Sequence, residues 1–470
     1  MEKVISNNEK VFGLTGLTSL LHQANDNTAL IIFRIAFGWI IFIEAIGAIL
    51  IGWAGKILVA PSFHFTFIGF DFLQTLPGEV FYLIYLLMAL SGVGIATGSY
   101  YRLSAILYFL TFAATYFAHK VSYNNHHYLM LLLSVFLIIV PANAWYSQDV
   151  RRQRVVPATY CRKWHLLLFL VQASLLYVYA AVAKLNTDWL SLQSSRLVVA
   201  NRTDWPIIGP FLQHDLGTAF IAYGGIAFDA LIVPAMLWRK TRPIAFIALL
   251  AFHASNALLF PIGIFPLLAI SLSVFFFPAK TLKRLFFRKK PDFIPGKSEI
   301  RPADRWITAG LIIYCCIQIF LPLRHHWFPG KVAWTEEGHR LSWRMMLRKK
   351  RSISRFTAVN KQTGKSWDIP LEEYLTPRQS QQVGNQPDLI WQFARYIGEE
   401  YQLKTGDDIA VYADIKVSLN GKPYQQFIDP ETDLTSVEWT RFQSASWIIP
   451  FREPPVRELP VREPPVSGTE

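Results

Sequence analysis

The chain has 470 residues, of which 52% are hydrophobic, and a mean hydropathy of +0.27. A soluble domain averages about 45–50% apolar residues even with glycine counted, so this composition excludes an ordinary soluble enzyme and indicates a membrane protein with a soluble tail. The net charge of +13 would suggest a nucleic-acid partner in a soluble protein, but basic cytoplasmic loops are the simpler cause here. The cysteines Cys161, Cys315 and Cys316 make no disulfide framework.

Nine apolar segments are candidates to cross a bilayer, for which about 17–25 residues are needed. They are 29–53, 79–98, 103–118, 126–145, 164–184, 218–238, 243–260, 263–278 and 306–323. The third and the eighth are short, so whether they cross fully stays open. The predicted fold class is an α-helical polytopic membrane domain of about nine spans.

Basic residues gather in the loops that follow the even-numbered segments. These loops carry Arg102, then the runs at 151–163, 239–242 and 280–290. By the positive-inside rule such loops face the cytoplasm. We therefore expect a multi-pass protein of the inner cell membrane, with its N-terminus in the cytoplasm and its C-terminal domain outside.

The chain after residue 325 changes character. Alternating apolar and polar residues at 353–359, 408–419 and 424–428 predict strands, and Asn420-Gly421 signals a hairpin turn. Residues 388–402 predict an amphipathic helix.

The predicted domain order has four parts. They are a cytoplasmic segment at 1–28, the membrane domain at 29–324, a β-rich extracytoplasmic domain at 325–450, and a tail at 451–470. The tail repeats REPPV, RELPV and REPPV and is expected to be disordered.

The fifth segment ends on a lysine within the stretch YVYAAVAKLNTDW, residues 177–189. Tyr177, Ala181 and Lys184 share one helix face, and neighbouring alanines leave room for a ligand. The plain alternative is a lysine that snorkels to the membrane surface. The polar stretch KVSYNNHHYL at 120–129 reaches the same side of the membrane in the predicted topology.

Other polar residues fall inside the apolar segments, where charge is costly. Arg34 and Asp229 are explained most simply by a buried structural ion pair. His253 and Asn256 share a helix face, and the simple explanation for them is hydrogen bonding between helices.

No motif of a soluble enzyme is present: the sequence has no P-loop, no GxSxG, no CxxC pair and no HExxH. The histidine pairs at 126–127 and 325–326 could suggest a metal. Adjacent histidines on a helix point about 100° apart, so one ion rarely takes both, and no metal is expected.

Four stretches, in this order, resemble motifs of vitamin K-dependent γ-glutamyl carboxylases in the short form typical of bacterial homologues. KVSYNNHHYL resembles the motif around an asparagine–histidine pair, here Asn125 and His126. AVAKLNTDWL resembles the segment with the catalytic lysine, here Lys184. FHASNALLF at 252–260 resembles a membrane histidine motif, and GHRLSWRMM at 338–346 resembles the segment just beyond the last span.

The resemblance implies an enzyme that couples two reactions. The lysine amine deprotonates a reduced vitamin K, a menaquinol or phylloquinol type of hydroquinone, which O2 converts to an epoxide. The strong base formed on the way removes a γ-hydrogen from a glutamate side chain of a protein or peptide, and the carbanion takes up CO2. A neutral lysine at a low-dielectric membrane edge suits this role.

The resemblance also implies a set of substrate-binding residues. A histidine just after the last span corresponds to His325, and a tyrosine of the animal enzymes falls at His339. An arginine after the lysine corresponds to Arg202, across a small insertion. The residues expected to bind substrate are Arg202, His253, Asn256, His325, His339 and Trp343.

The chain also departs from the animal enzymes, because it has no outer-side cysteines for their disulfide and lacks much of the region after their outer domain. Alternative functions are therefore a quinone epoxidase without carboxylase activity, a lipid- or quinone-handling membrane protein, and a non-catalytic scaffold.

Overall fold

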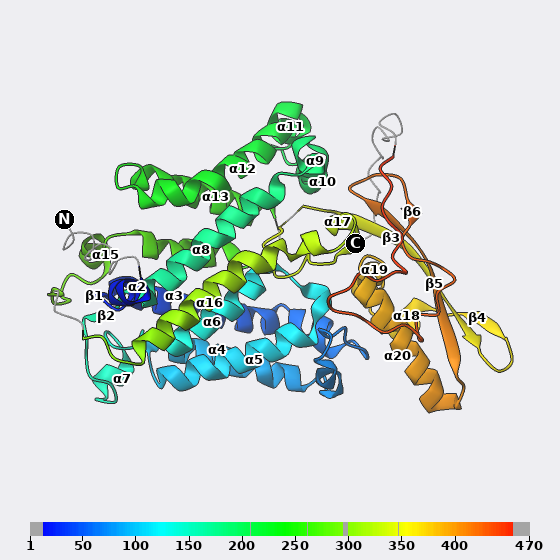
Figure 1. Ribbon diagram of the computed structural model, residues 1–470, viewed down its shortest axis with the longest axis horizontal. Helices are drawn as coiled ribbons and strands as arrows, with labels where there is room; N and C mark the ends of the chain where they lie inside the picture. The colour runs from blue at the N-terminus through cyan, green and yellow to red at the C-terminus, as the bar shows by residue number, and fades with distance from the viewer. Residues whose placement is uncertain (1–12, 207, 261, 295–298, 346, 455–470) are drawn as a thin grey trace.

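The computed structural model describes residues 13–206, 208–260, 262–294, 299–345 and 347–454. The molecule is elongated, with a helical region at one end and a sheet-containing C-terminal region at the other (Figure 1). Residues 1–12 of the predicted N-terminal segment and 455–470 of the proline-rich tail fall outside the described residues. Within the described part of the N-terminal segment, α2 (Leu14–Leu21) and β1 (Ala24–Asp26) are formed.

Within the described residues, the helical region is built mainly from nine apolar helices of different lengths. They are α3 (Thr28–Leu50), α4 (Val80–Thr97), α5 (Tyr101–Ala118), α6 (Asn125–Ile139), α8 (Lys163–Lys184), α12 (Asp215–Leu237), α13 (Arg242–Leu259), α14 (Phe265–Leu272) and α16 (Asp304–Phe320). Short helices connect them: η1 (Gly55–Val59), η2 (Asp71–Thr75), η3 (Lys120–Ser122), α7 (Gln148–Arg151), α9 (Thr187–Leu190), α10 (Gln193–Val199), η4 (Ala200–Arg202), α11 (Gly209–Gln213), η5 (Ser273–Phe276), α15 (Ala279–Phe286), η6 (Leu321–Trp327) and α17 (Val332–Thr335).

Six helices in the described residues are long and apolar enough to cross a membrane. They are Thr28–Leu50, Val80–Thr97, Lys163–Lys184, Asp215–Leu237, Arg242–Leu259 and Asp304–Trp327. The count of nine is therefore not confirmed. The predicted segments at 126–145 and 263–278 form only the shorter apolar helices Asn125–Ile139 and Phe265–Phe276, because Val140 and Phe277 are extended. The segment at 103–118 forms α5, which is not among the six.

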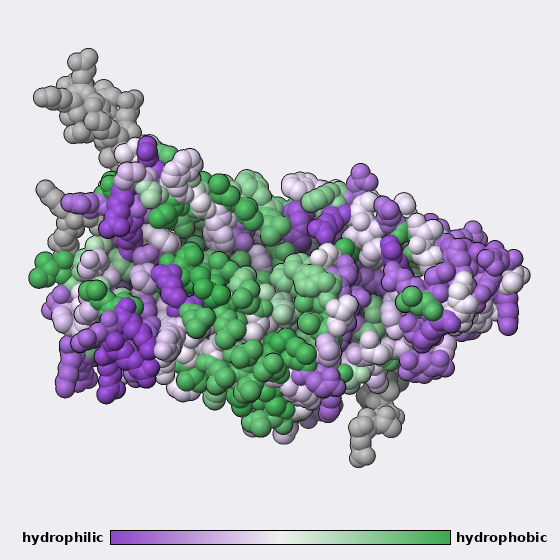
Figure 2. Space-filling view, turned by 90° about the horizontal axis from the view of Figure 1, so that it is seen from below, coloured by the Kyte–Doolittle hydropathy of each residue, from purple (hydrophilic) through white to green (hydrophobic). Residues whose placement is uncertain are grey.

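The surface agrees with a membrane location. A hydrophobic band covers the middle of the helical region on one face, between hydrophilic surfaces at its two ends (Figure 2). Large apolar side chains point outward along these helices, as Leu83, Leu103 and Leu231 do with exposures of 55%, 64% and 62%. In water such a surface would aggregate, whereas lipid covers it at no cost.

Small residues bring α3 and α4 into close contact. A Cβ on Gly38 of α3 would lie 2.4 Å from the backbone nitrogen of Ala96 on α4. Close backbone approach of this kind is how membrane helices gain packing where no hydrophobic effect drives them together.

The C-terminal region contains a four-stranded sheet in the order β4-β3-β5-β6. The strands are β3 (Lys350–Asn360), β4 (Ser366–Asp368), β5 (Ile409–Leu419) and β6 (Gln425–Gln426). β3 and β5 pair antiparallel along their whole length, from Lys350 opposite Leu419 to Asn360 opposite Ile409. The other pairs are antiparallel as well.

The turn after β5 is the one the sequence predicts. Asn420 and Gly421 both have positive φ, of 54° and 74°, as the common two-residue hairpin turn requires. The predicted strands and the predicted helix at 388–402 are found, the helix as α20 (Pro387–Thr405).

The β-rich character is not confirmed, because helices make up much of this region. α18 (Leu371–Tyr374), α19 (Pro377–Val383) and α20 accompany the sheet. α20 packs on the sheet through Phe393, whose ring lies 5.0 Å from that of Phe356 on β3. The core thus forms between a helix and one sheet face.

Buried charges join the two regions. Asp388, in the first turn of α20, forms salt bridges with Lys120 of the helical region at 2.8 Å and with Arg340 at 2.6 Å. Burial lowers the pKa of Lys120 to about 8 although Asp388 opposes the shift. Burial opposes ionisation of Asp388 too, but Arg340 and Lys120 hold the pKa of this carboxyl well below its usual range. The C-terminal region is therefore fixed next to the loop between α5 and α6.

Candidate functional site

Lys184 is the last residue of α8, and its ammonium turns toward the protein. Nζ forms an ion pair with the carboxylate of Asp229 on α12, and both side chains are largely buried, at 12% and 5% exposure. Nζ also lies 3.4 Å from the carbonyl of Ala180 and 5.9 Å from the ring of Trp189. The lysine is thus held inside the helical region by a carboxylate 45 residues away.

The expected buried ion pair of Asp229 exists, but its partner is Lys184 and not Arg34. Arg34 is fully buried on α3, and its Nη2 donates to the carbonyl of Tyr146 at 2.7 Å. Tyr146 belongs to the loop before α7, whereas Lys184 ends α8 beside α9 and the C-terminal region (Figure 1). Arg34 and Asp229, which the sequence suggests as an ion pair, therefore bind different partners.

A buried tyrosine–histidine pair lies two helical turns before Lys184. The hydroxyl of Tyr177 on α8 is 2.9 Å from Nε2 of His253 on α13. Tyr177 is 6% exposed and His253 is 1% exposed. Within the described residues, Nδ1 of His253 has no hydrogen-bond partner, which leaves one polar atom of the pair open to a ligand.

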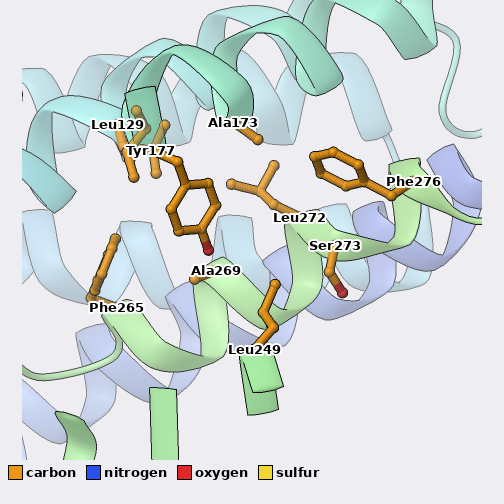
Figure 3. A pocket seen from close by; sticks show the side chains of 10 residues that line it. Leu129, Ala173, Tyr177, Leu249, Phe265, Ala269, Leu272, Ser273 and Phe276 are labelled. Carbon is orange, nitrogen blue, oxygen red and sulfur yellow. The ribbon is translucent and has the colours of Figure 1, made fainter. Parts of the chain in front are cut away.

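Tyr177 also lines a narrow apolar pocket between α8 and α14 (Figure 3). Its lining consists of Leu129, Ala173, Leu176, Tyr177, Leu249, Phe265, Ala269, Leu272, Ser273 and Phe276. The free space within it is about 10 Å³, about one water molecule. Side chains therefore nearly fill it.

Phe265 connects the two histidine motifs. Its ring lies 5.7 Å from that of His253 and 5.9 Å from that of His126. The stretches FHASNALLF and KVSYNNHHYL, far apart in the sequence, thus meet at one side chain of α14.

Asn125 begins α6 and is held on both sides of its amide. Its Nδ2 donates to the carbonyl of Arg344 at 3.0 Å, and its Oδ1 accepts from the hydroxyl of Tyr123 at 3.0 Å. That hydroxyl accepts in turn from the amide of Leu341 at 2.6 Å. Asn124 caps the helix by accepting from the amide of His127 at 2.8 Å. The start of α6 is therefore bound to the GHRLSWRMM segment.

The GHRLSWRMM segment and Leu347 just after it lie between the start of α6 and the end of α8. Trp343 is fully buried, with a φ of 56°, and packs against Tyr128 of α6 with ring centroids 4.9 Å apart. Leu347 belongs to a hydrophobic cluster with Ala183 and Trp189, beside Lys184. The segment after the last long helix thus runs from the asparagine–histidine motif to the lysine motif.

His325 and His339 lie near each other beside this segment. A Cβ on Gly338 would lie 2.6 Å from the Cα of His325, so the two backbones are in contact, and Gly338 has a φ of 73°. Burial lowers the pKa of His339 well below its usual value, so this imidazole is neutral near pH 7. Nδ1 of His325 donates to the carbonyl of Pro322 at 2.9 Å.

The guanidinium of Arg344 is close enough to act electrostatically on both histidines. Arg344 is half-buried. Nearby, Glu336 is bound by Arg348 at 2.5 Å and by Lys350 at 3.0 Å. Burial disfavours the Glu336 carboxylate, but these cations hold its pKa well below the usual range. The surroundings are thus rich in positive charge.

Arg202 and Asn256 lie around the end of α13. Nε of Arg202 donates to the carbonyl of Leu259 at 3.0 Å, and its guanidinium lies 5.2 Å from the ring of Trp205. Asn256 is half-buried one turn after His253. The loop after Lys184 is thus joined to the membrane histidine motif through Arg202.

The sequence missed the roles of two residues. Asp229 was noted as a charge within a span, but nothing in the pattern showed that it faces Lys184. Arg344 carried no signal apart from its place within GHRLSWRMM. Among the described residues, no group of three histidine, cysteine, aspartate or glutamate side chains could hold a metal ion.

Comparison with known families gives two matches that together cover most of the chain. Residues 22–280 match the family described as HTTM domain. Residues 303–454 match the family described as vitamin K-dependent gamma-carboxylase, lumenal domain. No solved structure gives a significant match.

Proposed function

Because the chain belongs to the vitamin K-dependent γ-carboxylase family, we propose that it is a membrane enzyme with two coupled reactions. It oxygenates a reduced vitamin K-type quinol to the epoxide with O2, and it carboxylates glutamate side chains with CO2. The observation that carries this proposal is the buried amine of Lys184, paired with Asp229 beside a tyrosine–histidine pair and an apolar pocket.

The proposed topology places this site at the outer side of the membrane. The basic loops at 151–163, 239–242 and 280–290 would face the cytoplasm, and the match to a lumenal domain supports an outer C-terminal domain. In this arrangement α5, α6 and α14 complete the nine crossings together with the six longer helices. The membrane domain would span 29–324 and the outer domain 325–450.

The topology has a direct test. Thr363 is exposed in the turn between β3 and β4, so a Thr363→Cys protein is expected to react with a membrane-impermeant thiol reagent on intact cells. Arg152→Cys, in the loop after α6, is the matched control and should react only after lysis. The reverse pattern would contradict the proposed orientation.

Lys184 would act as the base. The buried pair can exist as ammonium and carboxylate or, after one proton moves along their hydrogen bond, as neutral amine and carboxylic acid. Burial away from water disfavours the first, charged form. Asp229 would take the ammonium proton, and Nζ would then accept the proton of the quinol hydroxyl. The pair would end with one more proton and a net positive charge.

The lining of the pocket fits a prenylated quinol by its chemistry. Apolar side chains suit the ring and the tail. The polar atoms at this place are the hydroxyl of Tyr177, which lines the pocket, and His253, which is outside the lining and hydrogen-bonded to that hydroxyl at 2.9 Å. When bound, the quinol supplies with O2 the oxidising power and the strong base of the reaction. Since the free space is about 10 Å³, binding requires side chains such as Phe265 to move.

The acceptor glutamate needs a cation for its carboxylate, because loss of a γ-hydrogen places more negative charge beside it. His339 is neutral near pH 7 by its lowered pKa and would donate a hydrogen bond. Nδ1 of His325 already donates to the carbonyl of Pro322 at 2.9 Å, so in the neutral ring Nε2 would accept a hydrogen bond. Arg344 would supply the positive charge, with Arg202 as a second cation at the end of α13. Asn125, His126 and Trp343 would shape the space between this group and Lys184.

The proposal is tested with purified protein, reduced menaquinone, O2, labelled bicarbonate and a glutamate peptide. Wild-type protein is expected to form both epoxide and labelled peptide, and Lys184→Ala to form neither. Lys163→Ala, at the opposite end of α8, is the control and should keep both. Epoxide without labelled peptide from every peptide tried would identify a quinone epoxidase instead, and absence of both would exclude this enzyme class.

Arg344→Ala separates the two half-reactions. We expect it to lose carboxylation of the peptide while epoxide formation without peptide persists. Arg355→Ala is the matched control, because Arg355 is an exposed arginine on β3. Unchanged carboxylation by Arg344→Ala would exclude this residue from glutamate binding, and the same measurement on Arg202→Ala and His325→Ala decides their roles.

A further inference from the structure

A second cavity lies at the opposite end of the helical region from Lys184. It has a volume of about 570 Å³ and opens to the outside. Ligand sites commonly measure about 300–1,000 Å³. Its lining consists of Ile35, Trp39, Ala96, Thr97, Trp145, Tyr146, Ser147, Gln148, Val150 and Arg151. These residues come from α3, the end of α4 and the loop that contains α7, which lies far from the C-terminal region (Figure 1).

The cavity is apolar on one side and polar on the other. Ile35 and Trp39 lie on the membrane helix α3, and Trp39 is 45% exposed. Ser147, Gln148 and Arg151 lie on the loop beyond the helix ends. Such a division fits a ligand with an apolar chain and a polar head at the membrane boundary.

Positive charge is available at the polar side. Arg151 is exposed, and within the described residues its guanidinium has no hydrogen bond or ion pair. Asp149 is the only acidic residue in 140–163, and it is already engaged. Its carboxylate accepts from the amides of Tyr100 at 2.9 Å and Tyr101 at 3.0 Å and from the side chain of Asn143 at 2.9 Å.

Arg34 adds a second positive charge directly behind the wall. Its guanidinium is 0% exposed and donates to the carbonyl of Tyr146, a residue that lines the cavity. Within the described residues, its Nε and Nη1 have no hydrogen-bond partner. The carboxylate of Asp149 is close enough to attract this guanidinium but makes no hydrogen bond to it, and a buried cation adds positive potential to the adjoining space.

We infer that this cavity binds an anionic phospholipid, with Arg151 at the phosphate and an acyl chain along Ile35 and Trp39. The inference is independent of the proposed enzymatic function, because it uses neither Lys184 nor the C-terminal region. A lone aromatic residue at a helix end would only indicate the membrane interface. Here a cavity of ligand size, an unpaired arginine and a buried second cation occur together.

The test uses the full chain in uncharged detergent and measures its melting temperature. Phosphatidylglycerol should raise it in a saturable way, whereas phosphatidylcholine and inorganic phosphate should not. Arg151→Ala is expected to need about fivefold more phosphatidylglycerol for the same shift, the effect of about one basic residue at an anionic surface. Arg152→Ala, one residue along and outside the cavity lining, is the matched control and should behave like wild type.

A second variant tests the cavity itself. Thr97→Phe places a ring where the acyl chain is expected and should abolish the phosphatidylglycerol shift, while its melting temperature without lipid shows that it folds. If Arg152→Ala weakened the phosphatidylglycerol shift as much as Arg151→Ala does, the shift would reflect general surface charge, and the inference would be overturned. A shift by inorganic phosphate alone would overturn it too, since the ligand would then be a free anion.

Discussion

The two ends of the helical region each bury a basic side chain, but they treat it differently. At one end Lys184 faces the carboxylate of Asp229. At the other end Arg34 hydrogen-bonds only to the carbonyl of Tyr146 and has two donors without a partner in the described residues, while Asp149 attracts it without a hydrogen bond. The lysine can change its charge by passing one proton to its neighbour, whereas an arginine stays charged in proteins.

The two proposals for these ends depend on this difference: proton chemistry at Lys184 and a fixed charge at Arg34. A base must lose and regain a proton, which needs a group of variable charge and an acceptor beside it. A constant positive potential suits the recognition of an anion instead. Four substitutions or conditions test this comparison, in order of expected effect.

Lys184→Arg is expected to have the largest effect. The guanidinium keeps the positive charge and can still pair with Asp229, so folding should persist, but it cannot become a neutral base. Epoxide formation should fall about a thousandfold, as for loss of a general base. The measurement is the initial rate of epoxide formation, with Lys163→Arg as control. An active Lys184→Arg protein would return Lys184 to the role of a snorkelling lysine.

Asp229→Asn should reduce both stability and the rate of epoxide formation. Removing one member of a buried pair costs about 3–5 kcal/mol, seen as a lower melting temperature. In the proposed mechanism Asp229 accepts the ammonium proton of Lys184, which an amide cannot do, so the epoxide rate per folded molecule should fall as well. Asp215→Asn, an exposed position on the same helix, should change neither property; an unchanged epoxide rate in Asp229→Asn would leave Asp229 only a structural role.

Gly98→Ala tests the end of the molecule that contains Arg34. Gly98 ends α4 with a φ of 64°, and a Cβ there would lie 1.8 Å from Nη1 of Arg34. Strain and displacement of the guanidinium together should cost about 2 kcal/mol or more. Gly47→Ala, where a Cβ meets nothing within 4 Å, should leave the melting temperature nearly unchanged. The epoxide rate per folded molecule should persist in both variants, and its loss in Gly98→Ala would contradict the separation of the two ends.

Acid should loosen the attachment of the C-terminal region, with the smallest effect. Burial opposes ionisation of Asp388 and Glu336, but neighbouring cations lower their pKa values below the usual 3.8 and 4.5. The folded state therefore binds fewer protons than the unfolded state, and this stabilisation is complete above about pH 5 and is lost as the pH falls. From pH 6 to pH 4 we expect a loss of about 1 kcal/mol, measured by thermal unfolding. Asp388→Asn should flatten this dependence, whereas Glu399→Gln, exposed on α20, should not.

The sequence was most informative where structure is local. Six apolar segments gave helices of membrane-spanning length, and Asn420-Gly421 gave the expected turn. Two further segments ended early, at Ile139 and Phe276. Hydropathy reports how apolar a stretch is, whereas the end of a helix depends on individual backbone conformations.

Motif resemblance led to the family, and the matches to both parts of the chain confirm it. The roles of Lys184, Asn125 and His126 remain predictions, and so do those of the substrate-binding residues. The structure adds where these residues lie: His126 and His253 meet at Phe265, GHRLSWRMM binds Asn125, and Leu347 just after it packs at the end of α8.

By itself the sequence determined that the chain is a membrane protein with a C-terminal region of strands and a helix, because apolar content, periodicity and turn residues act over a few neighbours. Only the tertiary structure decided which charges meet. Lys184 and Asp229 are 45 residues apart, and Arg34 could equally have paired with that carboxylate. Helix packing fixes which helix faces touch. In a medium of low dielectric constant, the groups in contact strongly affect whether a buried basic side chain can give up its proton.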